Sequence, residues 1–189
     1  WSGSHHKYDT YSFHHIDPWF GPDPQGDLKI IASETEDPAT WKWTAADKLF
    51  LEMVKQAHER GIRVILDGVF NHAGLGFFAF EDVRKNQQAS RFKDWFIVES
   101  WDNSETPEDE FRWKGWHGIT ELPEFAEVET PEGGDLLPAV KSYLMAVTRR
   151  WMQPDGDVSR GIDGWRLDVA WMVPNAFWRE WNALVHDIN

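Results

Sequence analysis

The chain has 189 residues, contains no cysteine and carries a formal net charge of −13, with 32 Asp and Glu against 19 Lys and Arg. This charge argues against a nucleic-acid partner, because affinity for a phosphate backbone depends on cationic side chains. The lack of cysteine excludes disulfides and thiol chemistry, and no apolar run approaches the length of a membrane span, so we expect no membrane partner.

The first predicted helix and strand lie between residues 44 and 72. Thr44 and Asp47 form a capping-box pattern in which Asp takes the place of the usual Glu. The helix that they begin is predicted to stop at Gly61, and its apolar residues recur at helical spacing: Leu49, Phe50, Met53, Val54 and Ala57. The β-branched, apolar run from Ile62 to His72 then predicts a buried parallel strand.

The same order of helix and strand recurs downstream. Pro138 suits a first helical turn, and an apolar stripe follows it at Val140, Tyr143, Leu144, Val147 and Trp151. A turn leads to a second predicted strand around Ile162 to Ala170. Pro174 then opens another candidate helix, with apolar residues on one side at Phe177, Trp178, Trp181, Leu184 and Val185. This alternation predicts a parallel α/β sheet, either open or closed.

Polar side chains gather where the two predicted strands finish, which is where parallel α/β folds place their ligands. Asp67, Asn71 and His72 end the first strand. On the second strand, Arg166 and Asp168 stand two residues apart and therefore face the same side. An isolated pair of this kind is more often a structural ion pair. However, an adjacent guanidinium favours the ionised, nucleophilic form of a carboxylate, and the polar end of the first strand favours an active site here.

Segments throughout the chain resemble motifs of the α-amylase superfamily of glycoside hydrolases. Residues 67–72 (DGVFNH) resemble D-x-V-x-N-H on the third barrel strand, and residues 164–168 (GWRLD) resemble G-x-R-x-D on the fourth. Residues 6–10 and 16–21 resemble the H-x-Y-D and I-D-P-x-F-G motifs that follow the second strand. Residues 122–125 (LPEF) are similar to the M-P-K-L form of the neopullulanase, cyclomaltodextrinase and maltogenic amylase branch.

The resemblance implies a role for each matched residue. Asp168 would be the nucleophile of a retaining glycosidase, held ionised and oriented by Arg166. Tyr8 would stack on the sugar in the cleavage subsite, His72 would hydrogen-bond it, and Asp67 would support Arg166. The expected substrates are α-1,4-linked glucans, with α-1,6 linkages as an option: maltooligosaccharides, cyclodextrins, pullulan or starch. The chemistry requires no cofactor, and the aromatic content of 15% suits a sugar-binding surface.

The sequence offers little evidence for a metal. Asn71 matches a residue that binds a structural calcium ion in many members of this superfamily, but capping of the next loop by its side chain explains it equally well. The adjacent pairs His5–His6 and His14–His15 lie within the matched sequence, which argues against a tag, and neither pair has the spacing of a zinc site.

The resemblance implies a partial (β/α)8 barrel that covers about the second to fourth βα units. Residues 1–72 and 135–189 would belong to the barrel, and residues 73–134 would form a small, aromatic-rich insertion domain between the third strand and third helix. Since a complete barrel needs about 250 residues, we expect a fragment that ends before the general acid, a glutamate on the fifth strand. The fragment should therefore be inactive alone. A homo-oligomer is an option for the parent enzyme, and its localisation stays open.

Several alternatives stay open at this point. Glu121, Glu124 and Glu127 lie in the insertion and are expected to form a solvated acidic loop rather than to replace the general acid. Trp171 and Met172 stand where the family usually has a polar pair, so contacts on the leaving-group side are open. The parent protein could instead be a transglycosylase of the same superfamily, or a non-enzymatic amylase-like domain. Such non-enzymatic domains usually lose the nucleophile.

Overall fold

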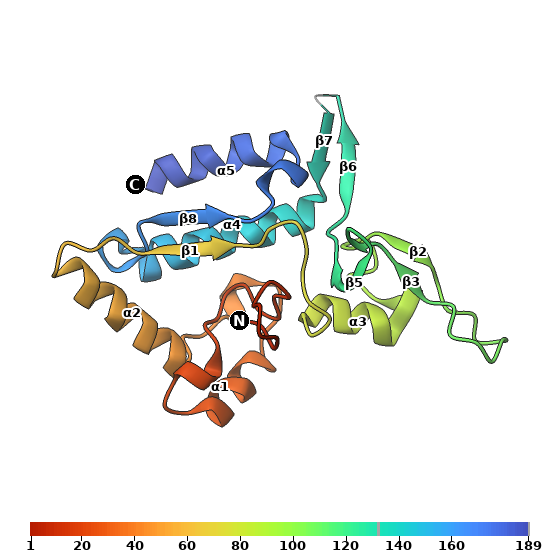
Figure 1. Ribbon diagram of the computed structural model, residues 1–189, viewed down its shortest axis with the longest axis horizontal. Helices are drawn as coiled ribbons and strands as arrows, with labels where there is room; N and C mark the ends of the chain where they lie inside the picture. Colours follow the sequence, from red (N-terminus) through yellow and green to blue (C-terminus); the bar gives the residue numbers. More distant parts are fainter. Residues whose placement is uncertain (132, 189) are drawn as a thin grey trace.

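Two parallel strands form the centre of the computed structural model, which describes residues 1–131 and 133–188. Strands β1 (Ile65–Gly68) and β8 (Gly164–Leu167) lie side by side (Figure 1), with Asp67 opposite Arg166 in the register. This pairing confirms the predicted parallel α/β arrangement of the two motif-bearing strands. Glu132, inside the predicted insertion, and Asn189, the last residue of the predicted barrel segment, lie outside the described residues.

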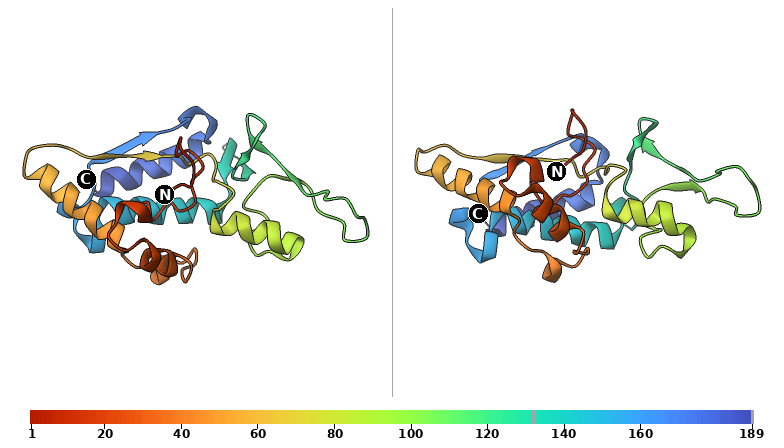
Figure 2. Two further views of the ribbon diagram at one scale, coloured as in Figure 1. Left: turned by 60° about the horizontal axis from the view of Figure 1, so that its bottom comes forward. Right: turned by 90° about the horizontal axis from the view of Figure 1, so that it is seen from below.

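Three long helices pack around these strands: α2 (Ala45–His58), α4 (Pro138–Met152) and α5 (Asn175–Ile188). Helices α4 and α5 contact each other along the sheet (Figures 1 and 2). The predicted apolar stripe of α4 is confirmed, because all of its members are buried. The predicted stripe of α5 is buried at Phe177, Trp181 and Leu184 and partly buried at Trp178 and Val185.

Helix α2 begins with the predicted capping box. The Thr44 side chain accepts a hydrogen bond from the Asp47 backbone N–H at 3.0 Å, and the Asp47 carboxylate accepts one from the Thr44 N–H at 3.1 Å. Gly61 ends the turn that follows the helix with a φ of 70°, a conformation that favours glycine.

The buried face of α2 differs from the predicted one. Leu49 and Met53 are 52% and 45% exposed, whereas Leu51 is buried beside Val54. The reason is the Asp47 carboxylate, which contacts the His15 side chain and accepts a hydrogen bond from the Ile16 backbone N–H. These contacts turn the Asp47 face of the helix toward the interior. Leu51 and Val54 follow on the same helical face, at i+4 and i+7 from Asp47.

Strand β1 is shorter and more exposed than the predicted buried strand. It covers Ile65–Gly68 only, and the side chains of Ile62 and Ile65 are 56% and 61% exposed. Within the described residues, β1 has β8 as its single hydrogen-bonded neighbour. A strand paired on one side cannot bury both faces, although the following residues Val69 and Phe70 are buried.

The segment after β1 builds one end of the molecule (Figures 1 and 2). It contains helix α3 (Phe78–Asn86) and three antiparallel strand pairs: β2 (Val98–Ser100) with β3 (Arg112–Trp113), β4 (Gly115–Trp116) with β5 (Ile119–Pro123), and β6 (Glu127–Thr130) with β7 (Gly133–Leu136). Strand β7 runs through position 134, where we placed the end of the insertion, because β6 pairs with it as far as Leu136.

The aromatic residues of this segment belong to the same apolar core as the helices that cover the sheet. Phe77 and Phe78 contact Tyr143 of α4, with ring centroids 5.7 and 5.9 Å apart. One apolar cluster therefore joins the insertion to the helices that cover the sheet. The remaining elements are helix α1 (Pro24–Ile31) and the short 3-10 helices η1 (Pro18–Phe20), η2 (Pro38–Thr40), η3 (Gln87–Ala89), η4 (Pro154–Gly156), η5 (Val158–Arg160) and η6 (Ala170–Met172).

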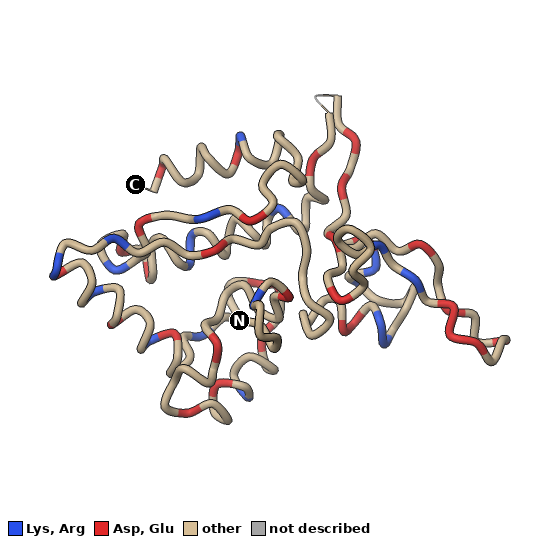
Figure 3. The backbone as a smooth tube through the Cα atoms, in the orientation of Figure 1, with Lys and Arg blue, Asp and Glu red and all other residues tan. Residues whose placement is uncertain are grey.

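The negative charge is unevenly distributed along the backbone. Figure 3 shows acidic residues concentrated on the protruding loop between β2 and β3, where residues 101–111 contain five Asp and Glu and no Lys or Arg. Among the described residues, none of the helices is both long and apolar enough to cross a membrane.

The capping box of α2 gives a first testable prediction. Thr44→Ala removes the acceptor for the Asp47 N–H in a fully buried setting, and we expect it to lower the unfolding free energy by about 1–2 kcal/mol. Thr44→Ser keeps the hydroxyl and should lose less. Chemical denaturation of the two variants measures the difference. An equal loss in both would mean that the Thr44 methyl group, and not the cap, carries the stabilisation.

Candidate active site

A cavity of about 560 Å³ opens at the carboxyl ends of β1 and β8. Its walls come from the N-terminal segment, from the end of β1, from β4 and β5, and from the end of β8. The residues that line it include His6, Tyr8, His72, Trp116, Glu121 and Asp168. The structure therefore gathers three of the predicted site residues, Tyr8, His72 and Asp168, around one space.

Arg166 connects the two parallel strands beside this cavity. Its Nη1 donates hydrogen bonds to both oxygens of Asp67, at 2.9 and 3.0 Å, and to Oδ1 of Asp168, at 2.7 Å. The hydrogen bonds that Arg166 donates, first to Asp67 and then to Asp168, raise the pKa of Arg166 well above its usual range. The guanidinium is half exposed, so its contribution here is the orientation of the two carboxylates rather than a buried ion pair.

The backbone holds Asp168 in a fixed position at the end of β8. Its N–H donates to the carbonyl of Gly68 on β1 at 3.1 Å, and its side chain is only 14% exposed. The next residue, Val169, has a φ of 41°, which is a strained conformation for a β-branched residue. The chain therefore turns sharply just after the carboxylate, and the Asp168 side chain lines the cavity.

His72 is fully buried in the wall of the cavity. Its Nε2 lies 3.2 Å from the carbonyl oxygen of Tyr8, which can only accept, and its Nδ1 lies 3.3 Å from Nδ2 of Asn71, which can only donate. This network assigns the proton to Nε2 of a neutral imidazole. Burial lowers the pKa of His72 below its usual value, which agrees with the neutral form.

Tyr8 is a partly exposed aromatic wall of the cavity. Its ring stacks on that of His6, with centroids 6.2 Å apart and an interplanar angle of 10°. The Arg166 guanidinium carbon lies 5.9 Å from the centre of the Tyr8 ring, which links this wall to the two aspartates.

Two side chains from the insertion also line the cavity. The sequence did not predict them as site residues. Trp116 lies 5.8 Å from the ring of His72 and donates from its indole nitrogen to the sulfur of Met172 at 3.0 Å. Glu121 of β5 is exposed and lines the same space. No local motif marks these residues, because the antiparallel pairing of β4 with β5 brings them to the cavity.

The prediction of a solvated acidic loop is wrong for one of its three residues, Glu124. Glu124 is buried and paired with Lys114 at 2.7 Å, and a backbone bridge joins it to His72. Burial raises the pKa of Glu127. Glu121 and Glu127 are both exposed overall, in agreement with the prediction, although partial desolvation affects the Glu127 carboxyl.

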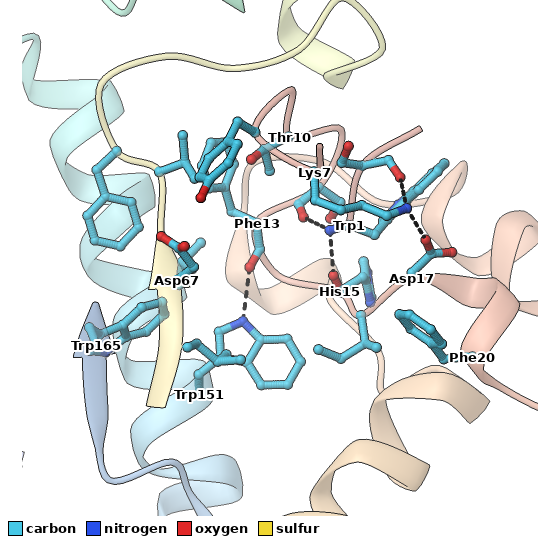
Figure 4. A pocket seen from close by; sticks show the side chains of 18 of the residues that line it. Trp1, Lys7, Thr10, Phe13, His15, Asp17, Phe20, Asp67, Trp151 and Trp165 are labelled. Carbon is cyan, nitrogen blue, oxygen red and sulfur yellow. Dashed lines mark hydrogen bonds and ion pairs between the residues drawn. The ribbon is translucent and has the colours of Figure 1, made fainter. Parts of the chain in front are cut away.

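A second cavity of about 350 Å³ shares the wall residue Tyr8 with the first and is also lined by Asp67. Figure 4 shows Asp67 and Trp165 on one side of it, and Lys7 and Asp17, which form an ion pair at 3.0 Å, on the other. Tyr8 lines both cavities, whereas Asp67 lines the second one and is held there by Arg166.

Comparison with known proteins identifies the family of the chain. The family model described as the catalytic domain of alpha amylase matches residues 44–187. The chain belongs to the α-amylase family. Among curated relatives in this family, it is 40% identical to neopullulanase 2 from Thermoactinomyces vulgaris over 188 residues, which are 100% of this chain and 26% of that protein. It is 36% identical to a cyclomaltodextrinase from Geobacillus thermopakistaniensis, over 96% of this chain and 24% of that protein.

Solved structures include proteins with a similar fold. The debranching enzyme from Nostoc punctiforme, in an acarbose-soaked crystal, matches with a TM-score of 0.69 and 33% identity, over 100% of this chain and 32% of that one. The 189 residues thus span about a quarter of the length of the curated relatives and about a third of this structure.

The buried state of His72 predicts a pH effect. Unfolded histidine binds a proton near pH 6.5, whereas folded His72 titrates lower, so the unfolded chain binds more protons between these two values. The contribution of His72 to stability is therefore complete above about pH 6.5 and is lost as the pH falls toward the folded pKa. Ring resonances of His72, assigned with His72→Gln, should titrate at lower pH in the folded than in the urea-unfolded chain. Equal midpoints would contradict the prediction.

Proposed function

We propose that the chain is part of a retaining glycoside hydrolase that acts on α-glucans, with Asp168 as the nucleophile. The observation that carries the proposal is the placement of Asp168: Arg166 orients its carboxylate, and it lines a cavity with an aromatic wall at Tyr8. Membership of the α-amylase family supports this reaction class. The names of the relatives, neopullulanase and cyclomaltodextrinase, support α-1,4-glucans, with α-1,6 linkages as a further option.

In this proposal Asp168 attacks the anomeric carbon as the bond to the leaving oxygen breaks. The leaving oxygen takes a proton from a general acid, and the same group then activates the water that releases the sugar. Arg166 carries its charge throughout and keeps one Asp168 oxygen occupied at 2.7 Å, so the other oxygen is available for attack. Asp67 fixes the guanidinium from the neighbouring strand through both of its oxygens.

The sugar would lie against Tyr8, whose ring is flat, partly exposed and braced by His6. His72 Nε2–H would reach a sugar hydroxyl only by exchanging its hydrogen bond to the Tyr8 carbonyl. We therefore assign His72 two successive roles, first holding the Tyr8 segment and then binding sugar. Trp116 offers a second ring on the insertion side of the cavity.

We assign the general acid to a residue outside these 189. A retaining pair of carboxyl groups stands about 5–5.5 Å apart, and Glu121 is the other acidic side chain among the described residues that line the cavity. Glu121 is an exposed residue of an insertion strand and does not match the glutamate of the family motif. We accordingly propose that the chain alone does not cleave maltooligosaccharides. The partial barrel, a calcium ion at Asn71 and a homo-oligomeric parent stay predictions.

The assignment of Asp168 is tested by Asp168→Asn in the complete protein. The amide is not a nucleophile, so we expect turnover of maltooligosaccharides, cyclodextrins and pullulan to fall by about 10⁴-fold or more with the fold intact. Asp94→Asn, at an exposed aspartate in the insertion, is the matched control. Near-normal rates in Asp168→Asn would refute the assignment, and a comparable loss in Glu121→Gln would point to Glu121 as the acid.

Arg166→Lys tests the orienting role separately. Lysine keeps the positive charge, but its ammonium group lies on a flexible stem and lacks the rigid, planar guanidinium that holds Nη1 between the two aspartates. We expect kcat to fall by about 100-fold with a smaller change in KM, because the nucleophile is misplaced rather than removed. An unchanged kcat would show that the backbone alone positions Asp168.

A further inference from the structure

A second cluster of functional side chains lies outside the candidate active site, between the N-terminal segment and the segment after α1. His14 and His15 converge on one carboxylate oxygen of Glu34: His14 Nε2 lies 3.2 Å and His15 Nε2 lies 2.6 Å from Glu34 Oε2. These three atoms all lie within 4.8 Å of one another. The histidines are adjacent in sequence, and Glu34 reaches them from beyond α1.

We propose that His14, His15 and Glu34 bind one Zn²⁺ ion, with the two Nε2 atoms and the Glu34 carboxylate as ligands. Two imidazoles and a carboxylate are a donor set that zinc uses. Tetrahedral zinc with bonds of about 2.1 Å places its ligand atoms about 3.4 Å apart. The three donor atoms need to move only slightly to meet that spacing.

The groups around the cluster already orient each ligand. His15 Nδ1 lies 2.7 Å from Oδ2 of Asp47, and His14 Nδ1 lies 2.8 Å from the Tyr143 hydroxyl. A carboxylate can only accept, so His15 must donate from Nδ1, which leaves Nε2 as the metal-binding atom. Such carboxylate–histidine contacts are typical of zinc sites. The other oxygen of Glu34 is held by the Lys42 backbone N–H at 2.6 Å.

Packing and charge hold the side chains of His14, His15 and Glu34 in place. The side chains of His14, His15 and Glu34 are 4%, 0% and 1% exposed. The His14 ring stacks on Trp41, with centroids 4.2 Å apart and an interplanar angle of 7°. The buried Asp47 is also paired with Arg150 at 3.2 Å, so Glu34 supplies the negative charge that faces the proposed ion.

A cavity beside the cluster supplies the remaining coordination position. It measures about 370 Å³ and is lined by His14 and Glu34 together with Ser12 and Glu81. The hydroxyl of Ser12, a residue 2% exposed, has no hydrogen-bond partner among the described residues. Zinc with three protein ligands keeps a water in its fourth position, and in the proposed site this water would accept from or donate to the Ser12 hydroxyl.

Zinc content tests this proposal on the complete protein, purified with a tag that contains no histidine. The metal is removed with a chelator, Zn²⁺ is added back, excess is dialysed away, and bound zinc is measured by mass spectrometry. We expect about one Zn²⁺ per chain. His14→Ala and Glu34→Gln should abolish retention, whereas the double variant His5→Ala/His6→Ala, at the exposed adjacent pair, should retain it.

Two further measurements test the zinc site even if the His14→Ala or Glu34→Gln variant folds poorly. Tyr143→Phe removes only the hydroxyl that contacts His14, and it should weaken zinc affinity about tenfold or more while circular dichroism stays unchanged. Co²⁺ in place of Zn²⁺ should give the visible absorption of tetrahedral coordination in the wild type. Failure of the folded wild type to retain zinc, or equal retention in Glu34→Gln, would overturn the proposal. These readouts do not involve glucan cleavage and are independent of the proposed function.

Discussion

The contact of Arg166 with Asp67 and Asp168 depends on the parallel pairing of β1 with β8. The register places Asp67 directly opposite Arg166, and Asp168 follows on the same face two residues later. A shift of one residue would turn Arg166 to the other side of the sheet and separate the three side chains. The backbone bond from Asp168 N–H to the Gly68 carbonyl fixes the same register at the strand ends. Orientation of the candidate nucleophile is therefore a consequence of the sheet itself.

A second set of contacts holds the segment that carries Tyr8. Asp47, on the first turn of α2, accepts from the Ile16 N–H, contacts His15 and is paired with Arg150 of α4. Burial of this carboxylate would be costly without these partners. The same acid caps α2, so helix, N-terminal segment and α4 are joined at one buried charge. Nearer the cavity, His72 holds the carbonyl of Tyr8. The Tyr8 segment is thus held by the residues that follow β1.

Sequence reasoning succeeded where neighbouring residues decide the structure. The capping box of α2 and the stripe of α4 are local patterns, and the alternation along β8 predicted that Arg166 and Asp168 face the same side. Sequence reasoning failed where residues distant in the sequence determine which side chains are buried. The inward face of α2 depends on His15, and the burial of Glu124 depends on pairing with Lys114 and on a bridge to His72. Glu34 lies near His14 and His15 because the chain returns to them after α1. The spacing of the two histidines in the sequence could therefore not predict this cluster.

The strain at Val169 explains how one short strand can serve both the sheet and the cavity. A left-handed conformation costs an L-residue about 1–2 kcal/mol, and here it falls on a residue that is 6% exposed. Burial of the Val169 side chain and the hydrogen bond from the Met172 N–H to its carbonyl offset part of that cost. Because the bend comes after Asp168, β8 keeps its register through Leu167. A relaxed turn earlier in the chain would release Arg166 and Asp168 from the sheet that positions them.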